Sequence, residues 1–319
     1  MLRYLISRIV SMIPLLVVIT AFTFIIGQYG AGDLAAYLAG TRGDAAKGFD
    51  VELYEQFREE LGMDDPILVR YGNWLWNALH GDFGRSYVMM GDPEISYLLA
   101  NAVPQSLQLV LAALVVVTLI GVPLGILSAV FSNSPLDRVL VSGSSILSAI
   151  PTFVLAPVAI IVVVVRLRLL PSVGVGWHGI FSQEAILPVA CLAAVGLLNV
   201  VRTTRVSMLE VLSQDYVRAA RARGLSEWAV VVRHVIRNAL LPVITVIGLT
   251  APLLLGATVF IEQIFNIQGF GLMMSKGLQR GDVPTVTASV LVSTVIVMAF
   301  SLVVDLLYGL IDPRVRVSR

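Results

Sequence analysis

The chain has 319 residues, of which 57% are hydrophobic and only 13% are charged. Charged residues make up about a quarter of a typical soluble domain, and a soluble fold needs a wettable exterior, so this composition excludes an ordinary soluble protein. The apolar stretches are continuous rather than alternating in segments of about ten residues, which excludes a transmembrane β-barrel. The net charge of +1 gives no indication of nucleic-acid binding. We therefore predict an all-helical integral membrane protein.

Six uncharged stretches are long enough to cross a bilayer, because about 20 helical residues span its hydrocarbon core. They cover residues 9–26, about 106–131 within the uncharged span 95–136, 139–165, 185–201, 239–261 and 283–304. The first stretch exceeds the apolar part of a signal peptide, and no small-residue cleavage site follows it, so a retained helix is predicted. The expected organisation is an N-terminal segment with the first helix (1–28), an extracytoplasmic segment (29–98), a five-helix core (99–311) and a C-terminal tail (312–319).

Basic residues are distributed unevenly between the two sides that six crossings define. With the N-terminus inside, the segments 1–8, 132–138, 202–238 and 305–319 are cytoplasmic, and they hold 13 of the 22 Lys and Arg residues but 6 of the 21 acids. An excess of Arg and Lys on the cytoplasmic side is the usual pattern of membrane proteins. We therefore expect a multi-pass protein with both termini in the cytoplasm.

Short patterns outside the spans predict local structure. The spacing of Val51, Tyr54, Phe57 and Leu61 favours an amphipathic helix over residues 50–62 that ends at Gly62 and packs over the outer mouth. Inside the spans, small residues and prolines are frequent, at Gly121, Pro123, Gly125, Gly248, Pro252 and Gly256. They favour close helix packing, with hinges in a moving pathway as the alternative.

The residues of a membrane-bound enzyme or a self-powered carrier are missing. The three histidines are far apart, and neither GxSxG nor a phosphate-binding loop occurs, so no catalytic, metal or cofactor site is predicted. Gly174, Gly176 and Gly179 spell GxGxxG, but no strand precedes them, and the single Cys191 is expected to be buried filler. The predicted spans contain no Asp, Glu, Lys, Arg or His, whereas proton- and ion-coupled carriers usually place such groups at membrane depth. An autonomous carrier or channel and an enzyme acting on lipid-linked substrate remain the alternative functions.

The basic segment 202–238 has the pattern of a helical hairpin. A first helix from Asp215 would stop at Gly224, and a second would begin after Ser226 as N-cap, with Trp228, Val231, Val232 and Val235 on its apolar side. Two interpretations fit this pattern: a hairpin resting on anionic headgroups, and a hairpin that contacts another protein.

The same segment resembles the EAA loop of bacterial and archaeal ABC importer permeases. The resemblance rests on Arg218-Ala219-Ala220-x-x-x-Gly224, and the longer run from Asp215 to Leu225, followed by His234-x-x-Arg237-Asn238, is similar to the B-type subunit of dipeptide and oligopeptide permeases. Further matching positions are spread over almost the whole chain: Asp82-Phe83-Gly84-x-Ser86, Glu262, Gly269-x-Gly271, Asp282-x-Pro284, Asp305-Leu306-x-Tyr308 and Asp312-Pro313-Arg314. The chain departs from the pattern at Arg218, where the superfamily has glutamate, and at Gly30-Ala31-Gly32-Asp33, where the family often has Pro-Gly-Asp-Pro.

The resemblance implies a type I ABC importer permease in the cell membrane that moves peptides or a related small solute. It implies a homologous C-type permease partner, two ABC ATPases that bind ATP and Mg²⁺, an extracytoplasmic solute-binding protein, and surrounding membrane lipid. The implied ATPase-coupling residues are Asp215, Tyr216, Arg218, Ala219, Ala220, Arg221, Ala222, Gly224, Leu225, Trp228, His234, Arg237 and Asn238. The implied contact loop for the binding protein includes Glu262, Gly269, Gly271, Asp282 and Pro284.

Overall fold

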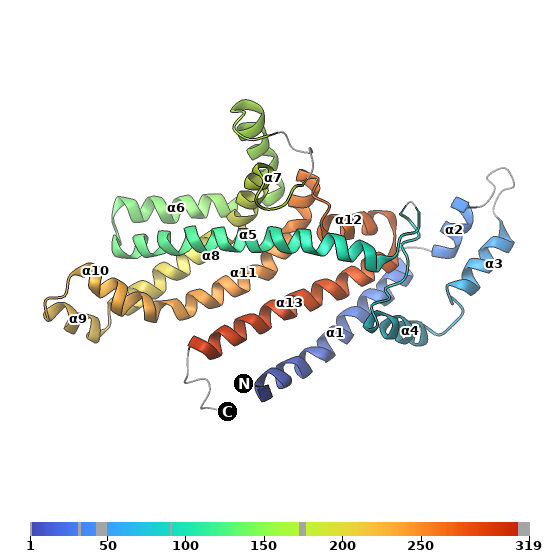
Figure 1. Ribbon diagram of the computed structural model, residues 1–319, viewed down its shortest axis with the longest axis horizontal. Helices are drawn as coiled ribbons and strands as arrows, with labels where there is room; N and C mark the ends of the chain where they lie inside the picture. The colour runs from blue at the N-terminus through green and yellow to red at the C-terminus, as the bar shows by residue number, and fades with distance from the viewer. Residues whose placement is uncertain (1, 31–32, 43–49, 90, 172–176, 312–319) are drawn as a thin grey trace. The chain divides into compact units, whose positions relative to one another are not determined.

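The structure, a computed structural model, describes residues 2–30, 33–42, 50–89, 91–171 and 177–311 (Figure 1). In this part of the chain the regular elements are helices, and five of them are long and apolar enough to cross a membrane, or six if a bent pair counts as one span. The all-helical prediction is therefore confirmed. The described ranges leave out the tail 312–319, Ala31, Gly32 and the first two glycines of GxGxxG, so the expectations for those residues stay untested.

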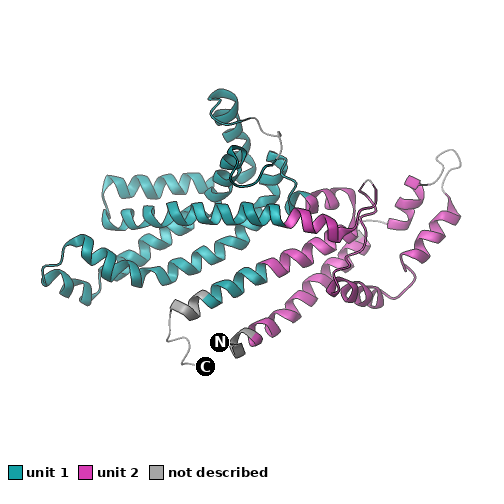
Figure 2. Ribbon diagram, viewed as in Figure 1, with its two compact units in different colours: residues 1–5, 104–272, 297–319 teal, residues 6–103, 273–296 magenta. Residues whose placement is uncertain are grey.

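The chain divides into two compact units (Figure 2). Unit 1 comprises residues 1–5, 104–272 and 297–319, and its centre is the pair α8 (Ile186–Leu212) and α11 (Ile236–Phe265). The helices α6 (Pro135–Ala149) and α7 (Thr152–Ala159) pack against α8, and α7 also packs against α11. Most of the buried apolar side chains of this unit come from α8 and α11.

Glycines allow the helices of unit 1 to approach closely. A Cβ atom at Gly125 would lie 2.7 Å from the carbonyl oxygen of Val201, and one at Gly196 would lie 2.4 Å from the Thr250 side chain. The packing interpretation of the Gly121–Gly125 pair is thereby confirmed, since both positions contact α8. Gly256 differs, because a Cβ there would meet nothing within 4 Å.

The third predicted span is broken, and the prediction of one continuous helix over 139–165 is wrong. The helix α6 ends at Ala149. It is followed by α7 and the π-helical turn η1 (Ile160–Arg166), and the helix direction changes by 100° between α6 and the α7–η1 segment. The cause is Pro151, which has no N–H and drives the preceding Ile150 to extended backbone angles (φ −80°, ψ 120°).

The fourth span also differs from its prediction, because α8 continues to Leu212 rather than ending at Val201. The charged Arg205 therefore lies on a helix, where its Nε and Nη2 atoms donate to the two carboxylate oxygens of Asp137 at 2.8 and 2.7 Å. Ser128 Oγ also donates to Asp137. This buried, charge-assisted network joins α6 and α8 to α5 (Ile95–Val130).

Unit 2 comprises residues 6–103 and 273–296. It contains most of α1 (Leu2–Gly30), then α2 (Leu34–Arg42), α3 (Val51–Glu60) and α4 (Ile67–Leu79), together with parts of α5, α12 (Phe270–Arg280) and α13 (Val283–Ile311). The helix predicted over 50–62 is confirmed, since the Asp50 side chain caps its N-terminus and Gly62 has a φ of +60°.

The helices α2 and α3 pack against each other at the start of the segment predicted to be extracytoplasmic. Tyr54 donates a hydrogen bond to Asp33 Oδ2 at 2.9 Å, and this bond to a carboxylate raises the pKa of Tyr54. Arg42 pairs with Asp92 and lies 5.7 Å from the centre of the Phe57 ring. The helix α2 buries Ala35, Leu38 and Ala39, whereas α3 has no buried residue.

Candidate functional site

The segment that precedes α11 folds as a hairpin of two short helices. The first, α9 (Asp215–Ala222), ends at a turn in which Gly224 has a φ of +82°, and the second, α10 (Glu227–Val230), begins after Ser226. The hydroxyl of Ser226 accepts a hydrogen bond from the backbone N–H of Ala229 at 3.4 Å, as expected of an N-cap. The predicted helix–glycine–helix arrangement is thus confirmed.

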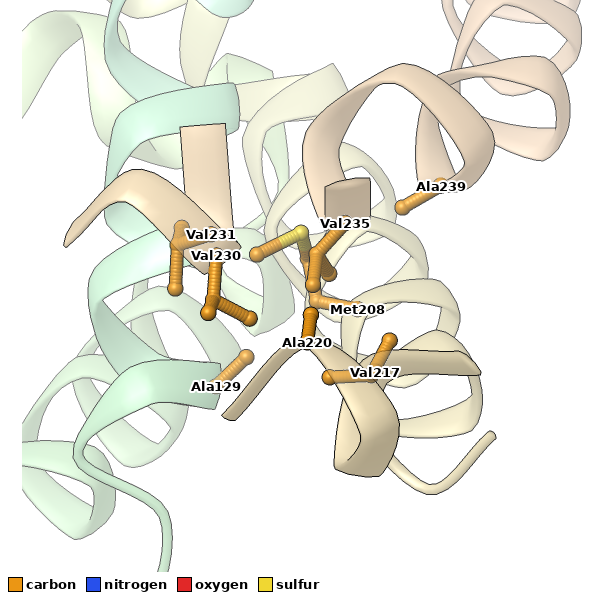
Figure 3. Packing of buried hydrophobic residues seen from close by; sticks show 8 residues of the cluster. All are labelled: Ala129, Met208, Val217, Ala220, Val230, Val231, Val235 and Ala239. Atoms are coloured by element: carbon orange, nitrogen blue, oxygen red, sulfur yellow. The ribbon is translucent and has the colours of Figure 1, made fainter. Parts of the chain in front are cut away.

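The hairpin (residues 215–235) rests on a compact apolar cluster, which we call the hairpin core (Figure 3). Three surrounding segments contribute to it, the end of α5, α8 and the start of α11, and the hairpin itself contributes through α9, α10 and the π-helical turn η3 (Val231–Val235). Its eight buried members are Ala129, Met208, Val217, Ala220, Val230, Val231, Val235 and Ala239. Because α10, η3 and α11 follow one another without a loop, movement of the hairpin is mechanically joined to the long helix α11.

The buried side of the second helix is not the one that the residue spacing predicts. Trp228 and Val232 were expected on the apolar side, but they are 76% and 45% exposed. Val230 is fully buried instead, and Val231 and Val235 lie beside it in the hairpin core. The buried face of this helix therefore contains Val230, and the large apolar side chain of Trp228 is exposed to solvent.

Polar contacts join the two helices on the outer side of the hairpin. Arg221 Nε and Nη2 donate to the two carboxylate oxygens of Glu227 at 2.8 and 3.1 Å. Asn238 Nδ2 donates to the hydroxyl of Tyr216 at 2.9 Å, which ties α9 to α11. Both pairs lie on the surface, so they fix the geometry of the turn more than they add to stability.

Most of the predicted coupling residues form one exposed surface around the turn. Ala220 is buried in the hairpin core, and His234 is half-buried. The other eleven are exposed: Asp215, Tyr216, Arg218, Ala219, Arg221, Ala222, Gly224, Leu225, Trp228, Arg237 and Asn238. The surface combines exposed apolar groups, Leu225 at 41% and Trp228 at 76%, with several guanidinium groups. Such a surface suits contact with a second protein.

A different arrangement occurs at the other end of α11, in residues 262–272, which comprise the last turn of α11, the connection and the first residues of α12 and which we call the α11–α12 loop. Glu262 is fully buried and accepts hydrogen bonds from Ser106 Oγ and from the Leu272 N–H, the latter at 2.9 Å. Ser106 Oγ in turn accepts from the Phe270 N–H at 2.8 Å. The carboxylate therefore holds the loop against α5.

Two glycines of this loop lie where no side chain fits. A Cβ at Gly269 would lie 2.4 Å from the carboxyl carbon of Glu262, and one at Gly271 would lie 2.7 Å from the Cα of Val259. Both glycines are buried, as is the Glu262 that they surround. These three predicted contact residues shape the loop and present no surface of their own.

The remaining two residues predicted for that contact lie in unit 2. Asp282 is fully buried and accepts from Ser86 Oγ at 2.5 Å and Thr285 Oγ1 at 2.7 Å, and within the described residues its Oδ1 atom has no partner. Pro284 follows it at the start of α13 and is half-buried. The described residues contain no group of three His, Cys, Asp or Glu side chains that could hold a metal ion.

Comparison with known proteins gives consistent matches over the whole chain. Residues 1–101 match the N-terminal model, and residues 121–317 the main model, of the binding-protein-dependent transport system inner membrane component. The chain is 37% identical to the oligopeptide transport system permease protein AppB of Bacillus subtilis and 35% identical to the glutathione transport system permease protein GsiC of Escherichia coli K12, each over 99% of both chains.

Solved structures give the same fold. An inward-facing structure of the MetNI methionine ABC transporter matches 68% of this chain and 97% of its own, at 21% identity and a TM-score of 0.56. An amino acid ABC transporter crystallised with histidines matches 67% of this chain and 94% of its own, at 17% identity and a TM-score of 0.51. The part of this chain beyond those matches accounts for about a third of its length.

Proposed function

Because this chain belongs to the family of binding-protein-dependent transport system inner membrane components, we propose that it forms a translocation pathway together with a homologous C-type permease subunit. Membership identifies it as the permease subunit of an ABC importer in the bacterial inner membrane, which works with ATPase and binding-protein partners. The autonomous carrier, the channel and the membrane enzyme are thereby set aside. In our proposal two ABC ATPases bind beneath the pair, and ATP and Mg²⁺ belong to them.

We propose that the hairpin is the element that couples ATP hydrolysis in one ATPase to movement of the permease. One observation carries this proposal: the hairpin exposes Leu225, Trp228 and a turn at Gly224, while its other side is fastened to α5, α8 and α11 by the hairpin core. A surface group that is rigidly fixed to several long helices can transmit a rigid-body displacement to them.

The orientation follows from the same proposal. A hairpin that binds an ATPase lies in the cytoplasm, which agrees with the excess of Arg in residues 202–238 and puts both termini on that side. The α11–α12 loop then faces outward, toward the binding protein. Its exposed residues Asn266 and Gln268, rather than the buried Glu262, Gly269 and Gly271, are suited to meet that protein.

The solute class is proposed from the relatives. AppB is named for oligopeptides and GsiC for glutathione, which is itself a tripeptide. We therefore propose that the importer carries peptides or a related small solute, and that the binding protein performs most of the selection.

Purification of the tagged chain in mild detergent tests the assembly. We expect mass spectrometry to find a second permease and one or two ABC ATPases with the chain. Recovery of the chain alone, under conditions that keep a control importer intact, would contradict the proposed assembly.

Cross-linking tests the role of the hairpin. The native Cys191 is buried, so a cysteine introduced at Leu225 would be the accessible thiol in the described part of the chain. With a maleimide–benzophenone reagent, whose benzophenone inserts into C–H bonds of a neighbouring protein on illumination, we expect Leu225→Cys to form a cross-link to an ATPase subunit. We expect Phe181→Cys, which is 99% exposed elsewhere, to form none. Labelling of Leu225→Cys by a headgroup-anchored maleimide in place of an ATPase cross-link would show that the hairpin rests on the membrane.

A further inference from the structure

The helix α4 has three chemically different faces. One face packs against α1 through Tyr71 and Trp74, whose ring centres lie 5.7 and 5.9 Å from that of Phe24, and the buried Ala78 is on the same face. The second face carries its polar side chains, and the third carries exposed apolar ones. Since the helix lies within the segment predicted to be extracytoplasmic, the third face needs an explanation.

The contacts with α1 place α4 at membrane depth. The hydroxyl of Tyr71 donates to the carbonyl oxygen of Val17 at 3.1 Å and lies 2.8 Å from Thr20 Oγ1. Val17 is in the middle of the 24-residue apolar span Ile6–Tyr29. At about 1.5 Å per residue it lies roughly 18 Å along the helix from Tyr29. A side chain that reaches Val17 therefore reaches the centre of the bilayer that α1 crosses.

The polar face of α4 borders a cavity, with Arg70 half-buried and Asn73 and Asn77 exposed. Arg70, Asn73 and Asn77 line a cavity of about 280 Å³, together with polar residues of the neighbouring loops such as Asp65 and Asp82. Arg70 Nη2 donates to Gln28 Oε1 at 2.8 Å, toward the end of α1, so its guanidinium group extends away from the level of Val17. This is how a long basic side chain avoids the hydrocarbon region.

The apolar face is also exposed. Leu68, Val69, Trp76 and Leu79 have exposed fractions of 75%, 48%, 65% and 73%. Large apolar side chains left exposed are unfavourable in water, and on a helix that reaches membrane depth they are the arrangement expected in lipid. A length of 13 residues is too short to cross the bilayer and is typical of a re-entrant or interfacial helix.

We propose that α4 lies within the leaflet at the C-terminal end of α1, and that Leu68, Trp76 and Leu79 contact phospholipid acyl chains. This is the outer leaflet in the orientation proposed above. The helix then belongs to the membrane domain and not to an aqueous extracytoplasmic segment, and it anchors the loops on either side of it to the bilayer. Trp76, whose ring centre is 4.7 Å from that of His80, takes the position near the headgroups where Trp is enriched.

Cysteine accessibility in intact cells, with the importer assembled, tests the proposal. In a Cys191→Ser background, Leu68→Cys and Leu79→Cys are compared with Val51→Cys on α3, which is 62% exposed, and with Asn77→Cys on the cavity side of α4. A thiol must ionise in water to react with a membrane-impermeant maleimide, so we expect positions 68 and 79 to react at least roughly tenfold more slowly than 51 and 77. Reaction of 68 and 79 at the rate of 51 would overturn the proposal.

Photolabelling of the unmodified importer separates lipid from protein. A phospholipid with a diazirine in its acyl chain should label peptides from α4 as well as those from the exposed side of α1, which includes Val10 and Ile13. Labelling of α1 without α4 would show that another subunit covers the apolar face, and that result would overturn the proposal. The partner assignment is measured separately, by co-purification, so it can stand if this proposal fails.

Discussion

The two ends of α11 use the same residue types in opposite ways. At its N-terminal end the hairpin leaves its charged residues and Gly224 in the open and hides only small apolar side chains. At its C-terminal end the α11–α12 loop hides the charged residue Glu262 and packs its glycines against it. The 30 residues of α11 put the two regions about 45 Å apart.

The comparison shows that a glycine in a motif can be required for two different reasons. Gly224 has a positive φ and an empty surrounding, so it is needed for the path of the backbone. Gly269 has no room for even one more carbon atom, so it is needed for close packing. Alanine substitutions at the two positions should therefore have different effects: at Gly224 the coupling is impaired, and at Gly269 the folded state is destabilised.

The largest effect on stability is expected from Gly269→Ala. The new methyl group would lie 2.4 Å from the Glu262 carboxyl carbon, and the carboxylate cannot withdraw without breaking its bonds to Ser106 and Leu272. Overpacking combined with a disturbed buried charge should cost about 3 kcal/mol. Thermal unfolding of the purified importer in detergent measures this loss as a lower Tm.

Gly256→Ala is the matched control for that variant. It lies in α11, the helix that precedes Gly269 in the chain, and its Cβ would meet nothing within 4 Å. An alanine in a helix interior is about 1 kcal/mol more favourable than glycine, so the Tm should stay or rise. Equal Tm values for the two variants would mean that the fit around Glu262 is not what requires Gly269.

The hairpin core should give the next largest effect. Val230→Ala removes two methyl groups from a fully buried position and should cost about 2 kcal/mol, whereas Val232→Ala, at a position 45% exposed, should cost well under 1 kcal/mol. Comparing the Tm values of the two variants tests which face of the second helix is buried. A larger loss of Tm for Val232→Ala than for Val230→Ala would show that the buried face is the predicted one, which contains Trp228 and Val232.

At Gly224 the expected effect is small on stability and large on function. Alanine in the left-handed region costs about 1 kcal/mol, and valine costs more, so Gly224→Val should still insert but present a distorted turn. ATP hydrolysis should continue while uptake falls, and both are measured in proteoliposomes with the full importer. Ala222→Val, also exposed but in a helix, controls for added bulk. Wild-type uptake by Gly224→Val would contradict the coupling role.

Features that depend on local sequence were predictable. The helical spans follow from the absence of charge over about 20 residues, and the hairpin turn follows from Gly224 with Ser226 after it. The break at Pro151 had a visible signal in the proline itself, but prolines are tolerated in many membrane helices, so the pattern alone did not separate a kink from a break of 100°.

Features that depend on distant partners were not predictable. Nothing in the sequence indicates that Arg205 meets Asp137, which lies 68 positions away. The fifth span was expected to end at Ile261 because a glutamate follows, yet α11 continues to Phe265 and buries that glutamate. The burial is possible because Ser106 and the Leu272 N–H supply donors, and only the fold brings them there.

The smallest effect is expected from the pair that closes the hairpin. Arg221 and Glu227 form a bidentate contact but are 39% and 69% exposed, so breaking it should cost about 0.5 kcal/mol. The sharper measurement is coupling, since this contact sets the angle between α9 and α10. Arg221→Glu should lower the uptake obtained per ATP hydrolysed, and the double exchange Arg221→Glu with Glu227→Arg should restore much of it. If the double exchange lowers the uptake per ATP as much as Arg221→Glu alone, transport requires the charge of Arg221 and not its contact with Glu227. Arg221 then acts on the ATPase directly.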